Sequence, residues 1–298
     1  MFDKLIQLAG EGNVRINEPM SSHTTFRCGG PADYFVTITN EKTLIQILSF
    51  LHQNHEEYLL IGNGSNLLIR DEGYRGAVLK LGGDFRRIST FPESHKIHCG
   101  SGAILANVAM AAAKEGLTGM EFAYGIPGSV GGAVVMNAGA YGGEMKQILK
   151  SVRILKDDNS VQEYSAHELC LGYRDSILKH QKGIVLSAEI ELEKGEPSEI
   201  QALMEELTRQ RREKQPLEYP SAGSTFKRPE GYFAGKLIQD AGLKGYRVGG
   251  AQVSEKHAGF VVNTDHATAQ DIITLIEDVT RIVKENSGIT LEPEVIIV

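Results

Sequence analysis

Hydrophobic positions follow two different periods along this chain, so the pattern predicts both helices and strands. One face of a helix that Asn40 can cap is formed by Leu44, Ile47, Leu48 and Leu51. The same spacing predicts further helices over 103–115, 198–215, 233–241 and 268–287. Alternating apolar residues predict a strand over 184–192, and shorter strands are expected at 58–61, 77–81, near 252 and at 259–262. Helices and strands are interleaved, as is typical of a protein of mixed α and β structure.

Capping signals mark where two of these helices begin. Ser198 followed by Gln201, and Thr268 followed by Asp271, have the spacing of a capping box. The first box opens a long polar helix, which we interpret as a connector. This helix carries four cations near its end, Arg209, Arg211, Arg212 and Lys214.

Charge and composition exclude several classes of protein. The net charge of −7 provides no basic field for nucleic acid or an anionic membrane, so an anionic ligand would need a local basic site. Cys28, Cys99 and Cys170 are odd in number and far apart, which favours a reducing compartment over a disulfide framework or a metal site. The N-terminus lacks the features of a signal peptide, and the longest run of small apolar residues, 103–113, is too short to span a bilayer. We therefore expect a cytoplasmic monomer or weak dimer without a metal site.

Glycine is the unusual feature of the composition. It accounts for 33 of the 298 residues, well above the ~7% of average proteins. One glycine cluster directly follows a predicted strand, where its N–H groups and side-chain donors can converge on a pyrophosphate. An ordinary tight turn is an equal alternative. The candidate contacts in this cluster are Ile61, Gly62, Asn63, Gly64, Ser65 and Asn66.

A second glycine cluster spans 125–143 and contains no charged side chain. Flexible linkers have few apolar residues, whereas this segment includes Val130, Val134 and Tyr141. We therefore interpret it as backbone laid against a flat, mostly apolar cofactor, with a packed loop as the alternative. The candidate contacts are Gly125, Ile126, Pro127, Gly128, Ser129, Gly131, Gly132, Asn137, Ala138 and Gly139.

Three further segments carry groups that suit an anionic substrate. Arg174 lies in the sequence Tyr-Arg-Asp-Ser, and the segment 221–229 combines three hydroxyls with two cations. Glu294 lies in an otherwise apolar segment near the C-terminus, and its carboxylate would need a partner if it were buried. Each feature has an ordinary alternative, namely a salt-bridged surface arginine, a Ser/Thr-rich turn and an exposed glutamate.

Six motifs, taken in order, resemble one protein family closely. They are HTTFRCGGPAD from residue 23, IGNGSNLL from 61, GIPGSVGGAVVMNAGAYG from 125, LGYRDS from 171, AGSTFK from 222 and LEPEV from 291. From about residue 20 to the C-terminus the chain resembles the UDP-N-acetylenolpyruvoylglucosamine reductases, the MurB family, in the compact branch that lacks a substrate-covering loop. The resemblance implies an α+β fold of the vanillyl-alcohol-oxidase type. Its implied parts are two FAD-binding subdomains, 1–80 and 81–197, and a smaller α+β substrate-binding domain, 198–298, whose C-terminal strand returns to the active site.

The resemblance also implies the reaction. NADPH reduces FAD, and flavin N5 passes the hydride to the enolpyruvyl ether of a UDP-sugar, which gives UDP-N-acetylmuramate for peptidoglycan synthesis. The family's catalytic trio maps onto Arg174, Ser224 and Glu294. On this mapping Arg174 stabilises an enediolate and Ser224 donates a proton. Glu294 is then either protonated or compensated by Arg174.

Substrate contacts are the least specific expectation. Family members often carry asparagine after the Phe-Lys pair, where this chain has Arg228, which could meet a substrate phosphate. The candidate contacts, each with an ordinary structural alternative, are Tyr173, Lys227, Arg228, Lys236, Gln252 and His257. Two other functions stay open, a flavin oxidase of related fold and a non-catalytic module that binds a nucleotide sugar.

Overall fold

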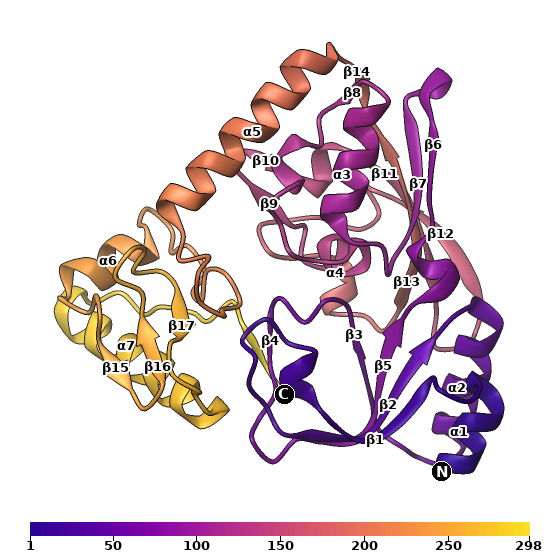
Figure 1. The fold of residues 1–298 in the computed structure, drawn as a ribbon, viewed down its shortest axis with the longest axis horizontal. Coiled ribbons are helices and arrows are strands. Elements are labelled where there is room, and N and C mark those ends of the chain that lie inside the picture. Colours follow the sequence, from indigo (N-terminus) through magenta and orange to yellow (C-terminus); the bar gives the residue numbers. More distant parts are fainter. The chain divides into compact units, whose positions relative to one another are not determined.

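The computed structural model describes all 298 residues, and the contacts among them divide the chain into two compact units (Figure 1). Unit 1 comprises Met1–Arg15, Phe35–Asn63 and Val78–Arg211, and unit 2 comprises Ile16–Tyr34, Gly64–Ala77 and Arg212–Val298. Each unit is therefore built from segments that are far apart in the sequence. The predicted division into three consecutive domains stays a prediction.

Unit 1 contains most of the regular structure. Its helices are α1 (Phe2–Ala9), α2 (Glu41–Gln53), α3 (Leu105–Lys114), α4 (Val130–Val135) and most of α5 (Pro197–Lys214). Its strands are β3 (Tyr58–Ile61), β6 (Ile88–Phe91), β7 (Lys96–Gly100), β8 (Leu117–Thr118), β9 (Gly139–Ala140), β10 (Gly143–Glu144), β11 (Leu149–Leu155), β12 (Val161–Ser165), β13 (Ile184–Glu191) and β14 (Glu193–Lys194). Five of these strands form an antiparallel sheet in the order β12-β11-β13-β7-β6.

A second sheet has the order β1-β2-β5-β3. Three of its strands, β1 (Val14–Pro19), β2 (Pro31–Ile38) and β5 (Tyr74–Leu81), contain the residues at which the chain passes from one unit to the other. The other two boundaries lie in the loop after β3 and inside α5. Because four of the five boundaries lie inside strands or a helix, no flexible linker marks them in the sequence.

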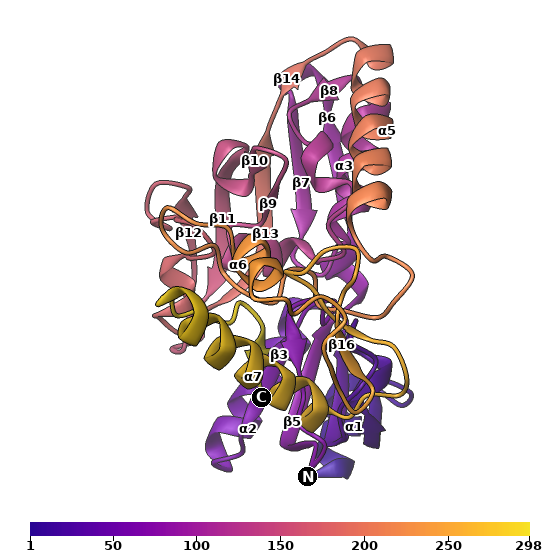
Figure 2. The ribbon, with the colours of Figure 1, turned by 90° about the vertical axis from the view of Figure 1, so that its left-hand side faces the viewer.

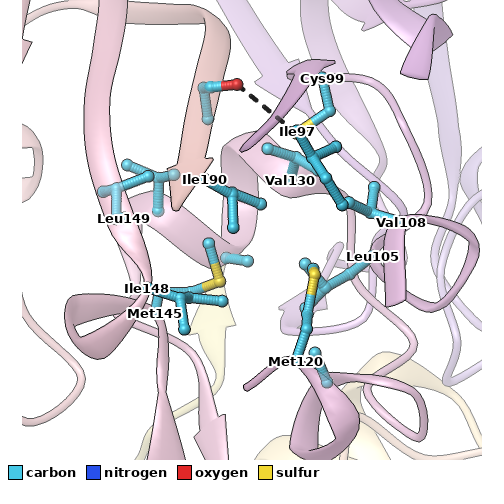
Figure 3. Close-up of a cluster of buried hydrophobic side chains, with 14 of the residues drawn as sticks. Ile97, Cys99, Leu105, Val108, Met120, Val130, Met145, Ile148, Leu149 and Ile190 are labelled. Atoms are coloured by element: carbon cyan, nitrogen blue, oxygen red, sulfur yellow. Dashed lines mark hydrogen bonds between the residues drawn. The ribbon is translucent and has the colours of Figure 1, made fainter. Parts of the chain in front are cut away.

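The core of unit 1 lies where α3 and α4 pack against the five-stranded sheet (Figure 3). Ile97 and Ile190 from the sheet meet Leu105 and Val130 from the two helices. Cys99 belongs to the same cluster, and burial raises the pKa of its thiol to about 12. Cys99 therefore acts as a small apolar core residue.

Unit 2 is smaller and centres on one long helix, α7 (Ala269–Ser287) (Figure 2). Its other elements are α6 (Ala234–Asp240), β4 (Leu67–Leu68), β15 (Arg247–Val248), β16 (Ala251–Val253), β17 (Val261–Asn263) and β18 (Ile296–Ile297). The buried face of α7 includes Ile272, Leu275 and Val279 and lies against the β15-β16-β17 sheet. β18 pairs in parallel with β4, so the C-terminal segment runs beside the residues that follow the first glycine cluster.

The capping prediction is confirmed at α7 and wrong at α5. Thr268 accepts from the N–H of Asp271 and Asp271 accepts from the N–H of Thr268, both at 3.0 Å. In contrast, α5 begins at Pro197, so Ser198 lies inside the helix instead of capping it. Proline suits a first helical position because no intrahelical partner is needed there for an N–H group. No helix combines the length and the apolar character that a membrane span requires.

Candidate functional site

The two glycine clusters meet within unit 1. The side chain of Asn63 donates a hydrogen bond to the carbonyl of Pro127 at 2.7 Å, across 64 positions of sequence. A Cβ atom built on Gly62 would lie 2.2 Å from the Oγ of Ser129. A larger residue at position 62 would therefore displace the Ser129 side chain, because the second cluster approaches the Gly62 backbone so closely.

The loop that follows β3 combines two glycines with polar side chains, from Gly62 to Asn66. Gly62 and Asn63 belong to unit 1, and Gly64 is the first residue of the next segment of unit 2. Gly64 adopts the left-handed conformation, with a φ of 64°, and a turn of this kind can direct successive N–H groups toward one point. N–H groups directed in this way are the donors that bind a diphosphate, which offers several anionic acceptor oxygens.

The second cluster is partly helical, since it contains α4. Ser129 caps α4 by accepting from the N–H of Gly132 at 3.4 Å. Gly131 has a packing role, because its N–H donates to the carbonyl of Ser101 and an added Cβ would lie 3.0 Å from the Cβ of Ser101. Some of the glycine surplus therefore arises from contacts between protein segments.

Asn137 fastens the second cluster to the segment that carries Arg174. Its side chain donates to the carbonyl of Gly172 at 2.9 Å and to the carboxylate of Glu144 at 3.0 Å. Its side-chain oxygen accepts from the N–H of Lys146 at 2.9 Å. The Asn137 side chain thus makes its bonds within the protein, and its N–H donates to the carbonyl of Val134 at 3.2 Å, so its contact with a cofactor stays a prediction. Glu144 is a partner that the sequence did not reveal.

Arg174 lies in a tight turn beside this cluster. Gly172 and Asp175 form an isolated bridge around it, and Arg174 itself has a φ of 54°. A side chain rarely adopts this conformation, and such strain is concentrated at functional sites. The guanidinium donates to the carbonyl of Gly139 at 3.3 Å and lies 5.2 Å from the centre of the Tyr173 ring. Arg174 therefore belongs to the same part of unit 1 as the second cluster.

Ser224 and Glu294 lie on adjacent segments of unit 2. The N–H of Glu294 donates to the carbonyl of Thr225 at 2.8 Å, and Phe226 and Pro293 form a bridge. Asn66 donates from its side chain to the carbonyl of Glu294 at 3.1 Å, which connects the loop after β3 to the same place. Ser224 is exposed and Glu294 is half-buried. The structure thus brings together three motifs that are far apart in sequence.

The predicted substrate contacts on unit 2 have protein partners of their own. Lys227 pairs with Glu292 and Lys236 pairs with Asp240. The roles of both lysines toward a substrate stay predictions, because these ion pairs also give each lysine a structural purpose.

The remaining three contacts on unit 2 differ in their surroundings. Gln252 donates to the carbonyl of Gly245 at 3.2 Å. His257 accepts from the N–H of Gly259 at 3.1 Å, and burial lowers the pKa of its ring. Arg228 lies 3.8 Å from the ring centre of Phe233, which is 62% exposed. A guanidinium stacked on an exposed aromatic ring is well placed to meet a ligand from solvent.

Comparisons with known proteins agree on one family. A family model described as the UDP-N-acetylenolpyruvoylglucosamine reductase C-terminal domain matches residues 215–298, and one described as an FAD binding domain matches 32–165. The UDP-N-acetylenolpyruvoylglucosamine reductase of Lachnoclostridium phytofermentans is 52% identical over 99% of this chain and 96% of its own. That of Caldanaerobacter subterraneus subsp. tengcongensis is 50% identical over 100% of this chain and 98% of its own.

Solved structures lead to the same relatives. The crystal structure of UDP-N-acetylenolpyruvylglucosamine reductase (MurB) from Thermus caldophilus matches with a TM-score of 0.82 and 36% identity, over 95% of this chain and 99% of that chain. Phl p 4, a grass pollen allergen with glucose dehydrogenase activity, matches with a TM-score of 0.51 over 66% of this chain and 44% of its own. At 13% identity, the second match shows a likeness of fold alone.

Proposed function

Because this chain belongs to the family of UDP-N-acetylenolpyruvoylglucosamine reductases, we propose that it reduces its substrate through Arg174, Ser224 and Glu294. It is an FAD-dependent oxidoreductase of peptidoglycan synthesis that uses NADPH and acts on a UDP-sugar enolpyruvyl ether. The predicted α+β fold of the vanillyl-alcohol-oxidase type is confirmed.

The residues of the two glycine clusters fit FAD. The observation that carries this assignment is the contact between the two clusters in unit 1, where Asn63 bonds to Pro127 and Gly62 lies against Ser129. We assign the diphosphate to the loop from Gly62 to Asn66 and assign the segment 125–139 to the flatter part of the cofactor. FAD, when bound, supplies the hydride chemistry that connects NADPH to the enolpyruvyl double bond.

Arg174 stabilises the charge that develops on the substrate. Hydride addition at the enolpyruvyl carbon distal to the carboxylate leaves negative charge on the adjacent carbon and on the carboxylate oxygens. A guanidinium is permanently charged and offers paired donors, so it matches such an enediolate. Its bond to the carbonyl of Gly139 holds it beside the segment assigned to FAD.

Ser224 and Glu294 complete the proposed chemistry. Ser224 gives a proton to the carbanionic carbon, and its exposure allows the proton to be replaced from solvent. An ionised carboxylate would repel an enediolate, so we assign Glu294 a protonated state or a charge compensated by Arg174. In the protonated state Glu294 would donate a hydrogen bond to the substrate.

Tyr173, Lys227, Arg228, Lys236, Gln252 and His257 are proposed substrate contacts. Arg228 is the best supported of them, since its stack on Phe233 faces solvent. We also propose a cytoplasmic monomer or weak dimer that binds neither nucleic acid nor membrane. The net charge of −7 supports the absence of anionic macromolecular partners.

Separating the two half-reactions tests the assignment of Ser224. Ser224→Ala should still be bleached by NADPH in an anaerobic absorbance experiment, but the enolpyruvyl sugar should no longer restore the oxidised flavin spectrum. Ser198→Ala, which removes an exposed hydroxyl on α5, should behave as the parent protein does. Survival of both half-reactions in Ser224→Ala would show that another group donates the proton.

The same preparation separates the alternative functions. An oxidase of related fold often holds FAD covalently, so its flavin would stay with the protein after acid precipitation. A non-catalytic nucleotide-sugar module would be colourless, or would hold a flavin that NADPH cannot bleach. The proposed reductase releases free FAD and is bleached.

A further inference from the structure

Arg211 lies against the first residue of the second glycine cluster. Arg211 belongs to the last turn of α5. Arg211, Gly125 and Tyr141 all lie in unit 1. A Cβ atom built on Gly125 would lie 3.0 Å from both the Cδ and the Nη1 of Arg211. The guanidinium is thus seated on peptide backbone, at a position where a larger residue than glycine would displace it.

The charge of Arg211 is not balanced by the protein. Burial lowers the pKa of its guanidinium, and the one opposing influence is the phenol of Tyr141, which is neutral at physiological pH. Arg211 makes no ion pair and donates no hydrogen bond within the chain. By comparison, Arg209 on the same helix pairs with Glu206 at 2.8 Å.

The end of the helix offers little compensation. The C-terminus of a helix carries only about half a negative charge, and Arg212 and Lys214 in the same turn share it. Removing a charge from water without a partner costs free energy. A purely structural role at this place would be met as well by an uncharged side chain of similar length.

We propose that Arg211 binds an anionic group of FAD. This proposal rests on the assignment of the segment 125–139 to FAD, since Gly125 is the first residue of that segment and carries the guanidinium on its backbone. FAD has two anionic parts, its diphosphate and, after reduction, its isoalloxazine ring. A planar guanidinium suits both, because each presents neighbouring acceptor atoms in one plane.

The test compares two variants of Arg211 with one variant of the neighbouring Arg212. Arg211→Gln removes the charge, Arg211→Lys keeps the charge without the planar fork, and Arg212→Gln removes an equal charge from an exposed residue one position along. FAD release from diluted holoenzyme is followed by flavin fluorescence, and the reduction potential is measured by equilibration with a reference dye. Circular dichroism confirms that each variant is folded, and Arg211→Lys keeps the test available if Arg211→Gln does not fold.

We expect Arg211→Gln to weaken FAD binding by about 10- to 100-fold, the effect of losing a charge-assisted hydrogen bond. Arg211→Lys should lose less, and Arg212→Gln should bind FAD as the parent protein does. If the diphosphate is the partner, the reduction potential stays constant. If the reduced ring is the partner, the potential falls by about 30 mV for each tenfold difference in affinity between the two redox states.

Two results would overturn the proposal. One is unchanged FAD release and potential in folded Arg211→Gln. The other is an increased KM for the UDP-sugar as the sole effect, which would assign Arg211 to the substrate. Failure of the proposed function would instead appear in the parent protein, as a reduced flavin that the enolpyruvyl sugar cannot reoxidise.

Discussion

A methyl group at position 62 tests whether the two glycine clusters meet as described. The φ of Gly62 lies outside the left-handed range, so alanine fits the backbone and would by itself stabilise the fold by about 0.4–1 kcal/mol. However, its Cβ would lie 2.2 Å from the Oγ of Ser129 and 3.3 Å from the Cβ. Overpacking of this kind costs about 1–3 kcal/mol. We therefore expect Gly62→Ala to destabilise the protein by about 1–2 kcal/mol, because the clash outweighs the entropic gain.

A double-mutant cycle isolates this contact. Ser129→Gly removes both atoms that the new methyl group would meet, and glycine at a helix N-cap costs only a few tenths of a kcal/mol, about 0.3, relative to serine. Urea unfolding at one fixed FAD concentration should show the double variant to be about 1 kcal/mol more stable than Gly62→Ala alone. Simple additivity of the two substitutions would refute the close approach of the clusters.

Three further predictions concern charge and exposure. Arg174→Lys should slow flavin reoxidation by the substrate by about 10²–10³-fold, with NADPH reduction unchanged in stopped-flow absorbance; equal slowing of both steps would contradict the assignment. Maleimide should label the exposed Cys170 in the native protein. Cys28 and Cys99 should be labelled only after unfolding, because both are buried and burial raises the pKa of each thiol to about 12. Labelling of three thiols in the native state would be inconsistent with the fold. Burial lowers the pKa of His257, so the unfolded chain binds its proton more tightly and stability falls as the pH drops below ~6.5. His257→Gln should reduce this loss of stability at low pH, measured by urea unfolding. An unchanged pH dependence would count against the role of His257.

Local features of the fold were predictable from the sequence. Asn40 caps α2 by accepting from the N–H of Thr43 at 2.9 Å, as its position before an amphipathic run indicated. Thr268 and Asp271 cap α7 reciprocally, because a capping box needs only residues three positions apart. The start of α5 was misplaced because Pro197 and Ser198 both carry N-terminal signals and the sequence does not decide between them.

Features that depend on distant partners were less accessible. The sequence predicted a glycine loop around Gly62, yet only the structure shows that Ser129 lies against the Gly62 backbone. Glu144 carries no signal of its role because its partner, Asn137, is recognised through geometry. The discontinuous units were also hidden, since most of their boundaries fall inside regular elements, namely β1, β2, β5 and α5.

The role of Arg211 in α5 also depends on residues that are distant in the sequence. The helix was interpreted as a polar connector, and Arg209, which is exposed and pairs with Glu206, fits that description. Arg211 does not, because its side chain is turned onto the backbone of Gly125. Arg211 differs from Arg209 in its burial, which depends on the tertiary fold and cannot be predicted from the local sequence.

The most direct test of the central claim is the anaerobic absorbance spectrum of the purified protein, recorded as NADPH and then UDP-N-acetylglucosamine enolpyruvate are added. The account predicts an oxidised flavin spectrum that NADPH bleaches and the UDP-sugar restores, with one UDP-N-acetylmuramate formed for each flavin reoxidised. A protein without flavin, or a flavin that stays reduced after the UDP-sugar is added, would contradict it.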